Sequence, residues 1–461
     1  MALSAAIILA AGEGTRMRSS KPKVLHTFCG KTFLNRVMAS VRAQEPQTLA
    51  VVVHFQAERV AEAARSYDSD VTIVNQDDVP GTGRAVQCAM AQLTETRELE
   101  GPVLVAASDM PLLDAETLRQ LLAYYNESGN GATVLTTMLD DPTGYGRIIR
   151  DRDGNVLRIV EQRDANSSEL AVHEVNTSVY VFDAKVLIEA IAGLKSDNAQ
   201  GEFYLTDALE TAKASGTVGA FAAPDPISVE GVNDRVQLAA LAKAHNLRIC
   251  ERWMREGVTI LDPNSTWIED DVTIARDATI MPGCFLQGRT VIGEDALIGP
   301  DTTLIDAVVD AEAVVERSRV QESHIGRAAN IGPWTYLRAG NEFGEGSKAG
   351  AFVEMKKAHI GNGTKVPHLS YVGDAEVGDG TNIGGGTITA NYDGVHKNRT
   401  HIGAGAHVGA GNLFVAPVEV GDNVTTGAGS VIRHAVPDDA MVYSENTQHI
   451  VEGWKPAWER K

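Results

Sequence analysis

With 461 residues, the chain is too long for one ordinary hydrophobic core, so two or three domains are expected. The hydrophobic share of 43% and charged share of 22% are typical of a globular protein, and no stretch approaches the roughly 18 uninterrupted apolar residues of a membrane helix. The formal net charge of -20 disfavours nonspecific binding to nucleic acid. Four widely spaced cysteines argue against a disulfide framework or zinc ribbon and favour a reducing cytoplasm.

The first half of the chain alternates short aliphatic runs with helical patterns. This order predicts a mostly parallel sheet with helices on both faces, a Rossmann-like α/β domain. The expected strands cover residues 5–9, 50–53, 71–74, 103–107 and 133–137.

A glycine-rich loop follows the first of these strands. Gly12 and Gly14 would let backbone N–H groups approach phosphate oxygens, while Arg16 and Lys23 supply positive charge. The loop is not a P-loop, because no Gly-Lys-Ser/Thr follows. It is not a dinucleotide fingerprint either, because Met17 stands where a third small residue is required. The sequence therefore predicts a phosphate site at the carboxyl end of the first strand.

Residues 233–257 show the pattern of one long helix, which would link the first domain to the rest of the chain. Apolar residues at helical spacing predict its buried face. These are Val236, Ala240, Ala244, Leu247 and Cys250.

A six-residue period begins near residue 268 and continues almost to the end of the chain. Its aliphatic positions include Ile268, Ile274, Ile280, Leu286, Ile292, Ile298 and Leu304, and later Ile325, Ile331, Leu337 and Phe343. This period suits a parallel β-helix, in which each short face of a coil points one aliphatic residue inward. Three segments are expected to interrupt the coils, at 305–324, 344–359 and 387–401, and a functional site is expected beside them.

Reactive side chains flank these segments. Arg338, Lys356 and Lys397 form a positive set able to bind a sugar phosphate. His368 is the best general base, because an amine that attacks a thioester must lose a proton and imidazole titrates near neutral pH.

The chain resembles, nearly end to end, the bacterial family of bifunctional N-acetylglucosamine-1-phosphate uridyltransferase/glucosamine-1-phosphate acetyltransferases. The motifs that carry the resemblance are Gly12-Glu13-Gly14-Thr15-Arg16-Met17, Gly81-Thr82-Gly83, Ser108-Asp109-Met110-Pro111, Asp141-Pro142-Thr143-Gly144-Tyr145-Gly146-Arg147, Asn198-Ala199-Gln200-Gly201-Glu202 and Val229-Glu230-Gly231-Val232-Asn233. It implies a uridylyltransferase domain over 1–232, a linker helix over 233–257, and a left-handed β-helix acetyltransferase domain with a tail over 258–461.

The resemblance also implies the roles of residues in the first domain. Phosphate and nucleotide contacts would come from Leu9, Ala10, Gly12, Arg16 and Lys23, uracil contacts from Gln76, Gly81 and Thr82, sugar contacts from Gly146, Glu161 and Asn176, and Mg²⁺ ligands from Asp109 and Asn233. The chemistry agrees, because hard oxygen ligands suit Mg²⁺ that is held partly by phosphates. A helix N-cap remains an alternative role for Asp109, and a turn or cap for Asn176 and Asn233.

In the second domain the resemblance implies two further groups of residues. Glucosamine-1-phosphate would bind to Arg338, Lys356, Tyr371, Asn382 and Lys397, and acetyl-CoA to Asn391, Tyr392, Ala410 and Ala428, with His368 as the base. The chain departs from the family at Glu13, Ala410 and Glu445, where Lys, Ser and Arg are common.

The leading interpretation is therefore an enzyme of UDP-N-acetylglucosamine synthesis. It would transfer acetyl from acetyl-CoA to glucosamine-1-phosphate and then uridylyl from UTP to the product, feeding peptidoglycan and lipopolysaccharide precursors. The family resemblance implies a homotrimer with shared acetyl-transfer sites, and no nucleic-acid or membrane partner is expected. Two alternatives stay open: a nucleotidyltransferase whose coils serve only allostery or assembly, and a nucleotide-sensing scaffold without catalysis.

Overall fold

The structure is a computed structural model that describes residues 2–95, 98–215, 217–445 and 447–459. The chain folds into two compact units, Met1–His245 and Asn246–Lys461. No helix in the described ranges is long and apolar enough to cross a membrane.

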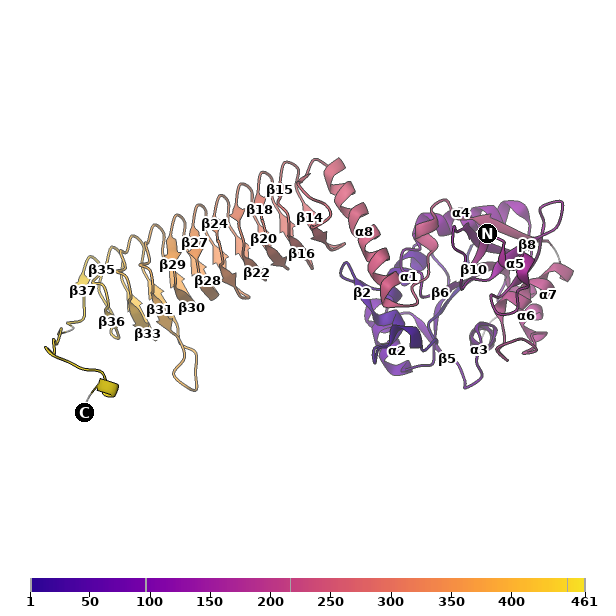
Figure 1. The fold of residues 1–461 in the computed structure, drawn as a ribbon, viewed down its shortest axis with the longest axis horizontal. Coiled ribbons are helices and arrows are strands. Elements are labelled where there is room, and N and C mark those ends of the chain that lie inside the picture. The colour runs from indigo at the N-terminus through magenta and orange to yellow at the C-terminus, as the bar shows by residue number, and fades with distance from the viewer. Residues whose placement is uncertain (1, 96–97, 216, 446, 460–461) are drawn as a thin grey trace. The chain divides into compact units, whose positions relative to one another are not determined.

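The first unit is built on a nine-stranded sheet whose main strand order is β11-β7-β10-β6-β1-β4-β5, with β8 and β9 attached beside β10 (Figure 1). The strands are β1 (Ala5–Leu9), β4 (Leu49–Val53), β5 (Thr72–Asn75), β6 (Pro102–Ala107), β7 (Ala132–Met138), β8 (Arg147–Arg150), β9 (Val156–Val160), β10 (Glu174–Asp183) and β11 (Val218–Ala222). Strand β10 runs antiparallel to β6 and β7, whereas β1, β4, β5 and β6 pair in parallel. The prediction of a mostly parallel sheet is confirmed, and each predicted strand is present.

Helices pack on both faces of this sheet. They are α1 (Phe33–Arg42), α2 (Ala57–Tyr67), α3 (Thr82–Thr94), α4 (Ala115–Ser128), α5 (Ser167–Leu170), α6 (Ala184–Ala192) and α7 (Ala208–Ser215). Alternate residues of β1 enter different hydrophobic clusters: Ala5 and Ile7 pack in the cluster with α3, α6 and α7, and Ala6 and Ile8 in the cluster with α1, α2 and α4. Two-sided burial explains why β1 is a continuous apolar run, because neither face can tolerate a polar side chain.

Helix α8 spans Arg235–Arg255, and its buried face agrees with the predicted one only at Cys250, while Ala244 and Leu247 are partly buried. Val236 is 79% exposed and Ala240 is also exposed. In the part of α8 that belongs to the second unit, the buried residues are Asn246, Ile249, Cys250 and Trp253. The prediction is wrong at the other positions because the buried stripe contains a polar residue. Asn246 is fully buried since its amide donates to Thr266 O at 2.7 Å and accepts from Ile268 N at 2.9 Å.

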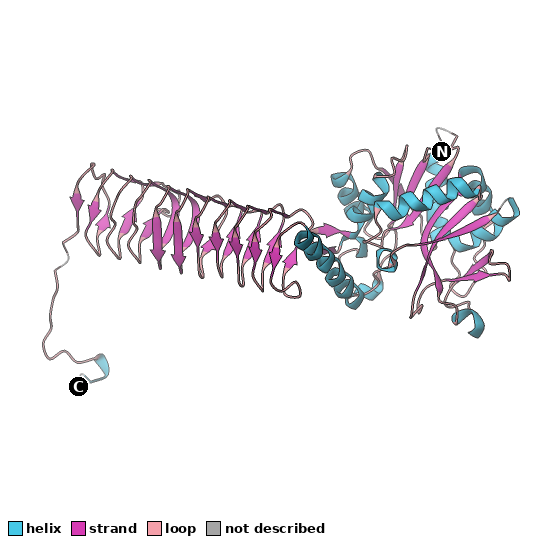
Figure 2. Cartoon of the chain, turned by 90° about the horizontal axis from the view of Figure 1, so that it is seen from above, coloured by secondary structure: helices cyan, strands magenta, loops and turns pink. Residues whose placement is uncertain are grey.

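The second unit is a parallel β-helix of stacked coils (Figures 1 and 2). One face is the seven-stranded sheet β12-β15-β18-β21-β24-β27-β29, a 17-stranded sheet forms most of the rest of the column, and β35 pairs with β37. The strands are β12 (Thr259–Ile260), β13 (Trp267–Ile268), β14 (Thr273–Ile274), β15 (Thr279–Ile280), β16 (Phe285–Gln287), β17 (Val291–Ile292), β18 (Leu297–Ile298), β19 (Thr303–Ile305), β20 (Val308–Val309), β21 (Val314–Val315), β22 (Arg319–Gln321), β23 (His324–Ile325), β24 (Asn330–Ile331), β25 (Tyr336–Leu337), β26 (Glu342–Phe343), β27 (Lys348–Ala351), β28 (Glu354–Ile360), β29 (Lys365–His368), β30 (Tyr371–Val377), β31 (Ile388–Ala390), β32 (Thr400–Ile402), β33 (Leu413–Val415), β34 (Val418–Val420), β35 (Thr425–Thr426), β36 (Val431–Ile432) and β37 (Met441–Val442).

Two of the three expected interruptions are wrong. Strands β20, β21 and β22 carry the coils through 305–324, and β27 and β28 carry them through 344–359. The six-residue count was lost because some sides of a coil have five residues, as between the buried Leu304 and Val309. The third segment does leave the repeat, since residues 391–399 form a loop between β31 and β32.

The Asn246 contacts give a prediction for the second unit. Asn246→Leu should lower the free energy of local opening at the Ile268 amide by about 1–3 kcal/mol, because two buried backbone groups lose their partners. Native-state hydrogen exchange at Ile268 measures this change. Val236→Ala, in the exposed part of the same helix, is the control and should leave the exchange unchanged. Equal protection in Asn246→Leu and the parent protein would contradict the assignment.

Candidate functional site

The carboxyl ends of β1 and β6 are fastened together at the edge of the first sheet. Ser108 donates to Leu9 O from both its backbone N, at 3.1 Å, and its Oγ, at 2.6 Å. Ala10 N donates to Val52 O at 2.9 Å. These bonds hold Leu9, Ala10 and Asp109 side by side where the strands end, the usual position of a binding site in a parallel sheet.

Basic and polar side chains of the predicted phosphate site converge at this edge. Gly14 has φ +67°, and a Cβ built on it would lie 2.6 Å from Lys23 Cβ, so a glycine is required for Lys23 to approach. Lys23 Nζ lies 2.7 Å from Asp109 Oδ2 and 3.4 Å from Asn233 Oδ1. Arg16 donates to Asn233 Oδ1 at 2.8 Å. Two cations and two oxygen-bearing side chains from distant parts of the sequence thus form one cluster.

The oxygens of Asp109 and Asn233 fit a small cation. Both contact the same ammonium group, that of Lys23, so they point toward one position. Neither is occupied by a helix cap: the side chain of Asp114 caps α4, and that of Asp234 accepts from the first amides of α8. The N-cap alternative for Asp109 is therefore wrong. Two protein oxygens are few for a dedicated cage but suit Mg²⁺ that is also held by phosphates and water.

The predicted uracil contacts line a loop beside α3. Gln76 Nε2 donates to Gly81 O at 3.3 Å. Gly81 has φ +123°, and a Cβ there would lie 2.3 Å from Phe203 O, so this position accepts only glycine. Thr82 Oγ1 accepts from Leu205 N at 3.0 Å. The structure brings the three predicted residues together and gives Thr82 a structural contact that the sequence did not suggest.

The three predicted sugar contacts are neighbours. Asn176 N donates to Gly146 O at 2.9 Å, and a Cβ on Gly146 would lie 3.4 Å from Glu161 Oε1. Burial is the main cause that raises the pKa of Glu161, and Thr206 Oγ1, 3.5 Å from its carboxylate, opposes this shift. Asn176 is 5% exposed and its amide donates to the hydroxyl of Tyr180 at 2.7 Å, so part of its hydrogen-bonding capacity is used within the fold.

Two residues of the first loop are open to solvent. No atom lies within 4 Å of a Cβ built on Gly12, and Glu13 is exposed. The carboxylate of Glu13 stands where the family commonly has Lys, so this loop carries less positive charge than the resemblance implies.

In the second unit, His368 heads a column of small residues. The equivalent positions in the following coils are Gly385, Ala410 and Ala428, and backbone hydrogen bonds of 2.8–3.2 Å join each corner to the next. His368, Ala410 and Ala428 are exposed. No side chain larger than a methyl group follows the imidazole along this corner for three coils, which leaves a narrow strip of backbone beside the predicted base.

The predicted sugar-phosphate cations gather at another corner, beside the 391–399 loop. Lys397 lies within hydrogen-bonding reach of Lys356 and is the main cause that lowers the pKa of Lys356, with burial second and Asp374 opposing. Asn391 Nδ2 donates to Asp374 Oδ2 at 2.5 Å, which fixes the start of the loop. Arg338 contacts Glu354 at 3.4 Å. Adjacent ammonium groups repel each other, so this corner favours a polyanion such as a phosphate.

The remaining predicted contacts lie on more than one face. Tyr371 begins β30, in the same sheet as Arg338 and Lys356. Asn382 instead bridges Lys365 and His407, which extends the face formed by β27 and β29. Tyr392 is 61% exposed. The residues predicted to bind one sugar phosphate are therefore split between two faces of a single column.

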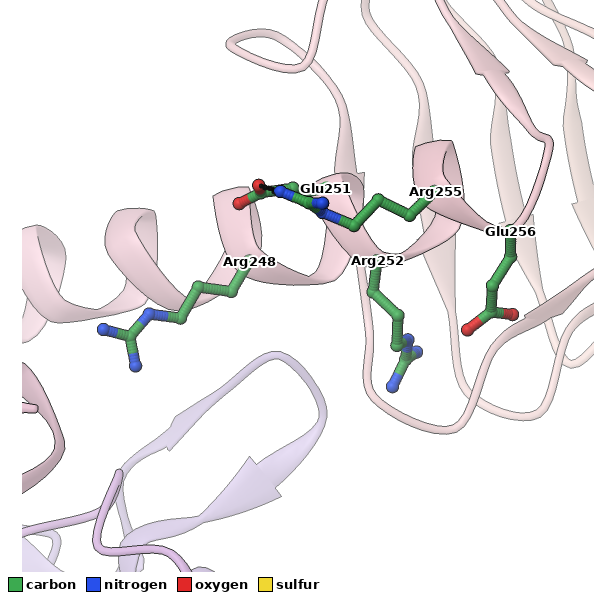
Figure 3. A pocket seen from close by; sticks show the side chains of 5 residues that line it. All are labelled: Arg248, Glu251, Arg252, Arg255 and Glu256. Carbon is green, nitrogen blue, oxygen red and sulfur yellow. Dashed lines mark hydrogen bonds and ion pairs between the residues drawn. The ribbon is translucent and has the colours of Figure 1, made fainter. Parts of the chain in front are cut away.

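A cavity of about 450 Å³ lies beside α8, and no predicted site residue lines it (Figure 3). It is lined by Arg248, Glu251, Arg252, Arg255 and Glu256, and Arg255 pairs with Glu251 at 2.5 Å. Since its charges are mixed and its lining comes from one helix end, we assign it no role.

Comparisons with known proteins agree with both units. Residues 6–204 match a family described as MobA-like NTP transferase domain, and residues 399–434 match one described as bacterial transferase hexapeptide, with six repeats. The bifunctional protein GlmU of Bifidobacterium longum (strain NCC 2705) is 84% identical over 460 residues, covering 100% of each chain. The chain belongs to the GlmU family. GlmU of Bifidobacterium animalis subsp. lactis (strain AD011) is 76% identical over 460 residues and 100% of each chain. GlmU of Paenarthrobacter aurescens (strain TC1) is 50% identical over 455 residues, 98% of this chain and 92% of the relative.

As a GlmU protein, the chain is a bifunctional transferase of UDP-N-acetylglucosamine synthesis. Its two activities are those of a glucosamine-1-phosphate acetyltransferase and a UDP-N-acetylglucosamine diphosphorylase. The family assignment rejects the alternatives in which the coils only assemble the protein or the chain only senses nucleotide.

Sequence reasoning missed several residues that shape these sites. Arg147 and Gln162 support the loop before Gly146, and Asp374 fixes the start of the 391–399 loop. Arg147 belongs to the Asp141–Arg147 motif, but the motif gave it no role, and no local signal identifies Gln162 or Asp374, since their partners lie about 15–18 residues away in the sequence.

Proposed function

We propose that the first unit transfers uridylyl from UTP to N-acetylglucosamine-1-phosphate at the carboxyl edge of its sheet. The observation that carries this proposal is the convergence of Arg16, Lys23, Asp109 and Asn233. Arg16 and Lys23 bind the UTP phosphates, to which Leu9, Ala10 and Gly12 contribute contacts. Uracil binds to Gln76, Gly81 and Thr82, and the sugar to Gly146, Glu161 and Asn176.

The reaction at this site needs positioning more than proton transfer. An oxygen of the sugar phosphate attacks the α-phosphorus of UTP, and pyrophosphate leaves. A phosphate oxyanion is already nucleophilic at neutral pH, so no side-chain base is required. Asp109 and Asn233 are proposed to hold Mg²⁺, which would neutralise charge on the phosphates. Arg16 and Lys23 orient the same phosphates by charge-assisted hydrogen bonds.

We propose that the second unit transfers acetyl from acetyl-CoA to glucosamine-1-phosphate. The amine of the sugar attacks the thioester carbonyl, His368 removes a proton from this amine, and the CoA thiolate leaves. Arg338, Lys356, Tyr371, Asn382 and Lys397 bind the sugar phosphate. Asn391, Tyr392, Ala410 and Ala428 contact acetyl-CoA, and the small residues after His368 leave room for a slender chain beside the base.

The acetyl-transfer site is proposed to be shared between copies of the chain. Asn382 and His368 belong to the face formed by β27 and β29, whereas Tyr371 and Lys356 belong to the neighbouring sheet. Outward side chains on two faces of one column diverge, so a second copy must supply part of the pocket. A homotrimer satisfies this requirement, because closed threefold symmetry pairs the two faces at every interface.

All four cysteines lie in the described part and none forms a disulfide, which supports a cytoplasmic location.

The two reactions should be separable by single substitutions. His368→Ala should lower the acetyl-transfer rate about 10²–10⁴-fold, the usual effect of losing a general base. Asp109→Ala should abolish uridylyl transfer because the metal loses an oxygen ligand. Each variant should retain the other activity, which serves as its control for folding. Assays with glucosamine-1-phosphate and with preformed N-acetylglucosamine-1-phosphate measure the two steps. Full acetyl transfer by His368→Ala would contradict the role of the base.

The contact between Lys23 and Asp109 predicts a competition between Lys23 and the metal. Lys23→Met should increase the affinity of the nucleotide-free enzyme for Mn²⁺, because the ammonium no longer occupies the oxygens of Asp109 and Asn233. Electron paramagnetic resonance of free Mn²⁺ measures this binding without turnover. Lys21→Met is the matched control, since it removes the same charge from the same loop. Equal affinities in Lys23→Met and Lys21→Met would mean that only the general electrostatic field matters.

Shared sites predict complementation between two inactive variants. Mixed trimers of His368→Ala and Asn391→Ala subunits should regain part of the acetyltransferase activity, because some interfaces pair an intact base with an intact acetyl-CoA contact. Subunit exchange is followed with two affinity tags, and activity is measured on the doubly tagged fraction. A doubly tagged fraction as inactive as its parents would exclude sites built from two copies.

A further inference from the structure

A buried guanidinium lies beneath the sugar contacts of the first unit. Arg147 begins β8, follows Gly146 directly and is 2% exposed. Burial lowers its pKa, with Asp141 acting in the opposite direction. A positive charge in such a position is costly unless it is paired and fully hydrogen-bonded.

The partners of this guanidinium within the described residues are neutral. Nη1 donates to the carbonyl of Tyr145, and Nη2 donates to Gln162 Oε1 at 2.9 Å. The same Gln162 oxygen accepts from Gly144 N at 3.1 Å. Nε of Arg147 is buried and has no hydrogen-bond partner in the described part of the chain. An aliphatic side chain of similar length would fill this space at a lower cost in desolvation.

The planar guanidinium does what an aliphatic chain cannot: it joins three segments at fixed distances. Strand register pairs Arg147 with Val160, the last residue of β9, so Glu161 and Gln162 follow directly after this neighbouring strand. Nη2 thus holds Gln162, the residue after Glu161, and Nη1 holds the carbonyl of Tyr145, the residue before Gly146. Two of the predicted sugar contacts, Gly146 and Glu161, are therefore each next in sequence to a residue that is bonded to this guanidinium.

The loop is fastened at a second point. Gly231 N donates to the hydroxyl of Tyr145 at 3.2 Å, and the next residue, Val232, donates from its N to Asp109 O at 2.8 Å. Loop 141–146 is therefore attached on one side to Arg147 and on the other to the segment that carries Asn233. Movement of the loop would change the separation between the sugar contacts and the predicted metal ligands.

We propose that Arg147 and Gln162 are a positioning pair that sets the width of the sugar subsite and so determines the affinity for the acetylated sugar phosphate. Neither residue touches the substrate. The proposal rests on the assignment of Gly146 and Glu161 to the sugar. This role explains why the guanidinium of Arg147 is buried although its hydrogen-bond partners are neutral. The two N–H groups at fixed positions in the planar guanidinium are needed, not its positive charge.

The test is steady-state kinetics of uridylyl transfer in the full-length protein. Arg147→Met and Gln162→Leu should each raise KM for N-acetylglucosamine-1-phosphate by about 10–100-fold, the scale expected when reacting groups are displaced by about 1 Å. KM for UTP should change less than about threefold, as should the acetyl-transfer rate, which reports on folding of the rest of the chain. Because the two residues act through one contact, the double variant should be no worse than the more affected single variant.

Two further variants distinguish positioning from general support of the fold. Arg147→Lys should recover part of the loss, since an ammonium can reach one acceptor but not span both. Arg150→Met removes an exposed arginine from the same strand and should leave KM for the sugar phosphate unchanged. An unchanged KM in the milder Gln162→Leu variant would overturn the proposal, as would equal losses of affinity for UTP and sugar. Glu161→Gln tests the underlying assignment separately: if it leaves sugar binding intact while Gln162→Leu impairs it, the sugar site lies elsewhere.

Discussion

Parallel pairing of each coil with the next governs the second unit. Every backbone group of a short strand bonds to the equivalent strand above and below, so equivalent positions repeat about every 4.8 Å along the column. A side chain can therefore be combined only with neighbours in its own column or at its own corner. This constraint places the small residues that follow His368 in one column and the cations around Lys356 at a separate corner. It also places Asn382 on a different face from Tyr371 and Lys356, which supports the proposal that a second copy completes the acetyl-transfer site.

The first unit solves a different problem, because a chain with net charge -20 must bind two phosphorylated substrates. Positive charge is concentrated where strands end, and Arg16 and Lys23 approach Asp109 and Asn233 closely. In this arrangement the carboxylate of Asp109 balances the charge of Lys23, whereas Arg16 contacts only the neutral amide of Asn233, so the cluster keeps positive charge that attracts phosphates. Lys23 can exchange Asp109 for a phosphate oxygen, so binding of nucleotide and metal would be coupled through one side chain.

Rigid backbone supports the candidate site of the first unit. Gly14 and Gly81 adopt positive φ at points where a Cβ would collide with Lys23 and with the backbone of Phe203. Beside the predicted sugar contacts, Arg147 ties the 141–146 loop to Gln162, just after β9, through neutral acceptors. Gly14 and Gly81 are themselves predicted substrate contacts, whereas Arg147 supports predicted contacts without being one. A resemblance between sequences detects the first kind of residue more readily than the second.

The sequence by itself determined the two architectures and the chemistry of both sites. Runs such as residues 5–9 predict strands buried on two faces, and the six-residue period predicts the coils, because each pattern follows directly from local geometry. It also singled out Arg16, Lys23, Asp109 and His368 by motif and residue type. The interruptions predicted at 305–324 and 344–359 are wrong because a coil can have sides of five residues as well as six. A count of six loses the repeat there, and only the register of the stacked strands shows that the coils continue. The buried face of α8 was mistaken because Asn246 is buried through bonds to Thr266 and Ile268, residues about 20 positions away. Tertiary structure alone decided such matters, since a polar group's cost depends on whether a distant partner reaches it.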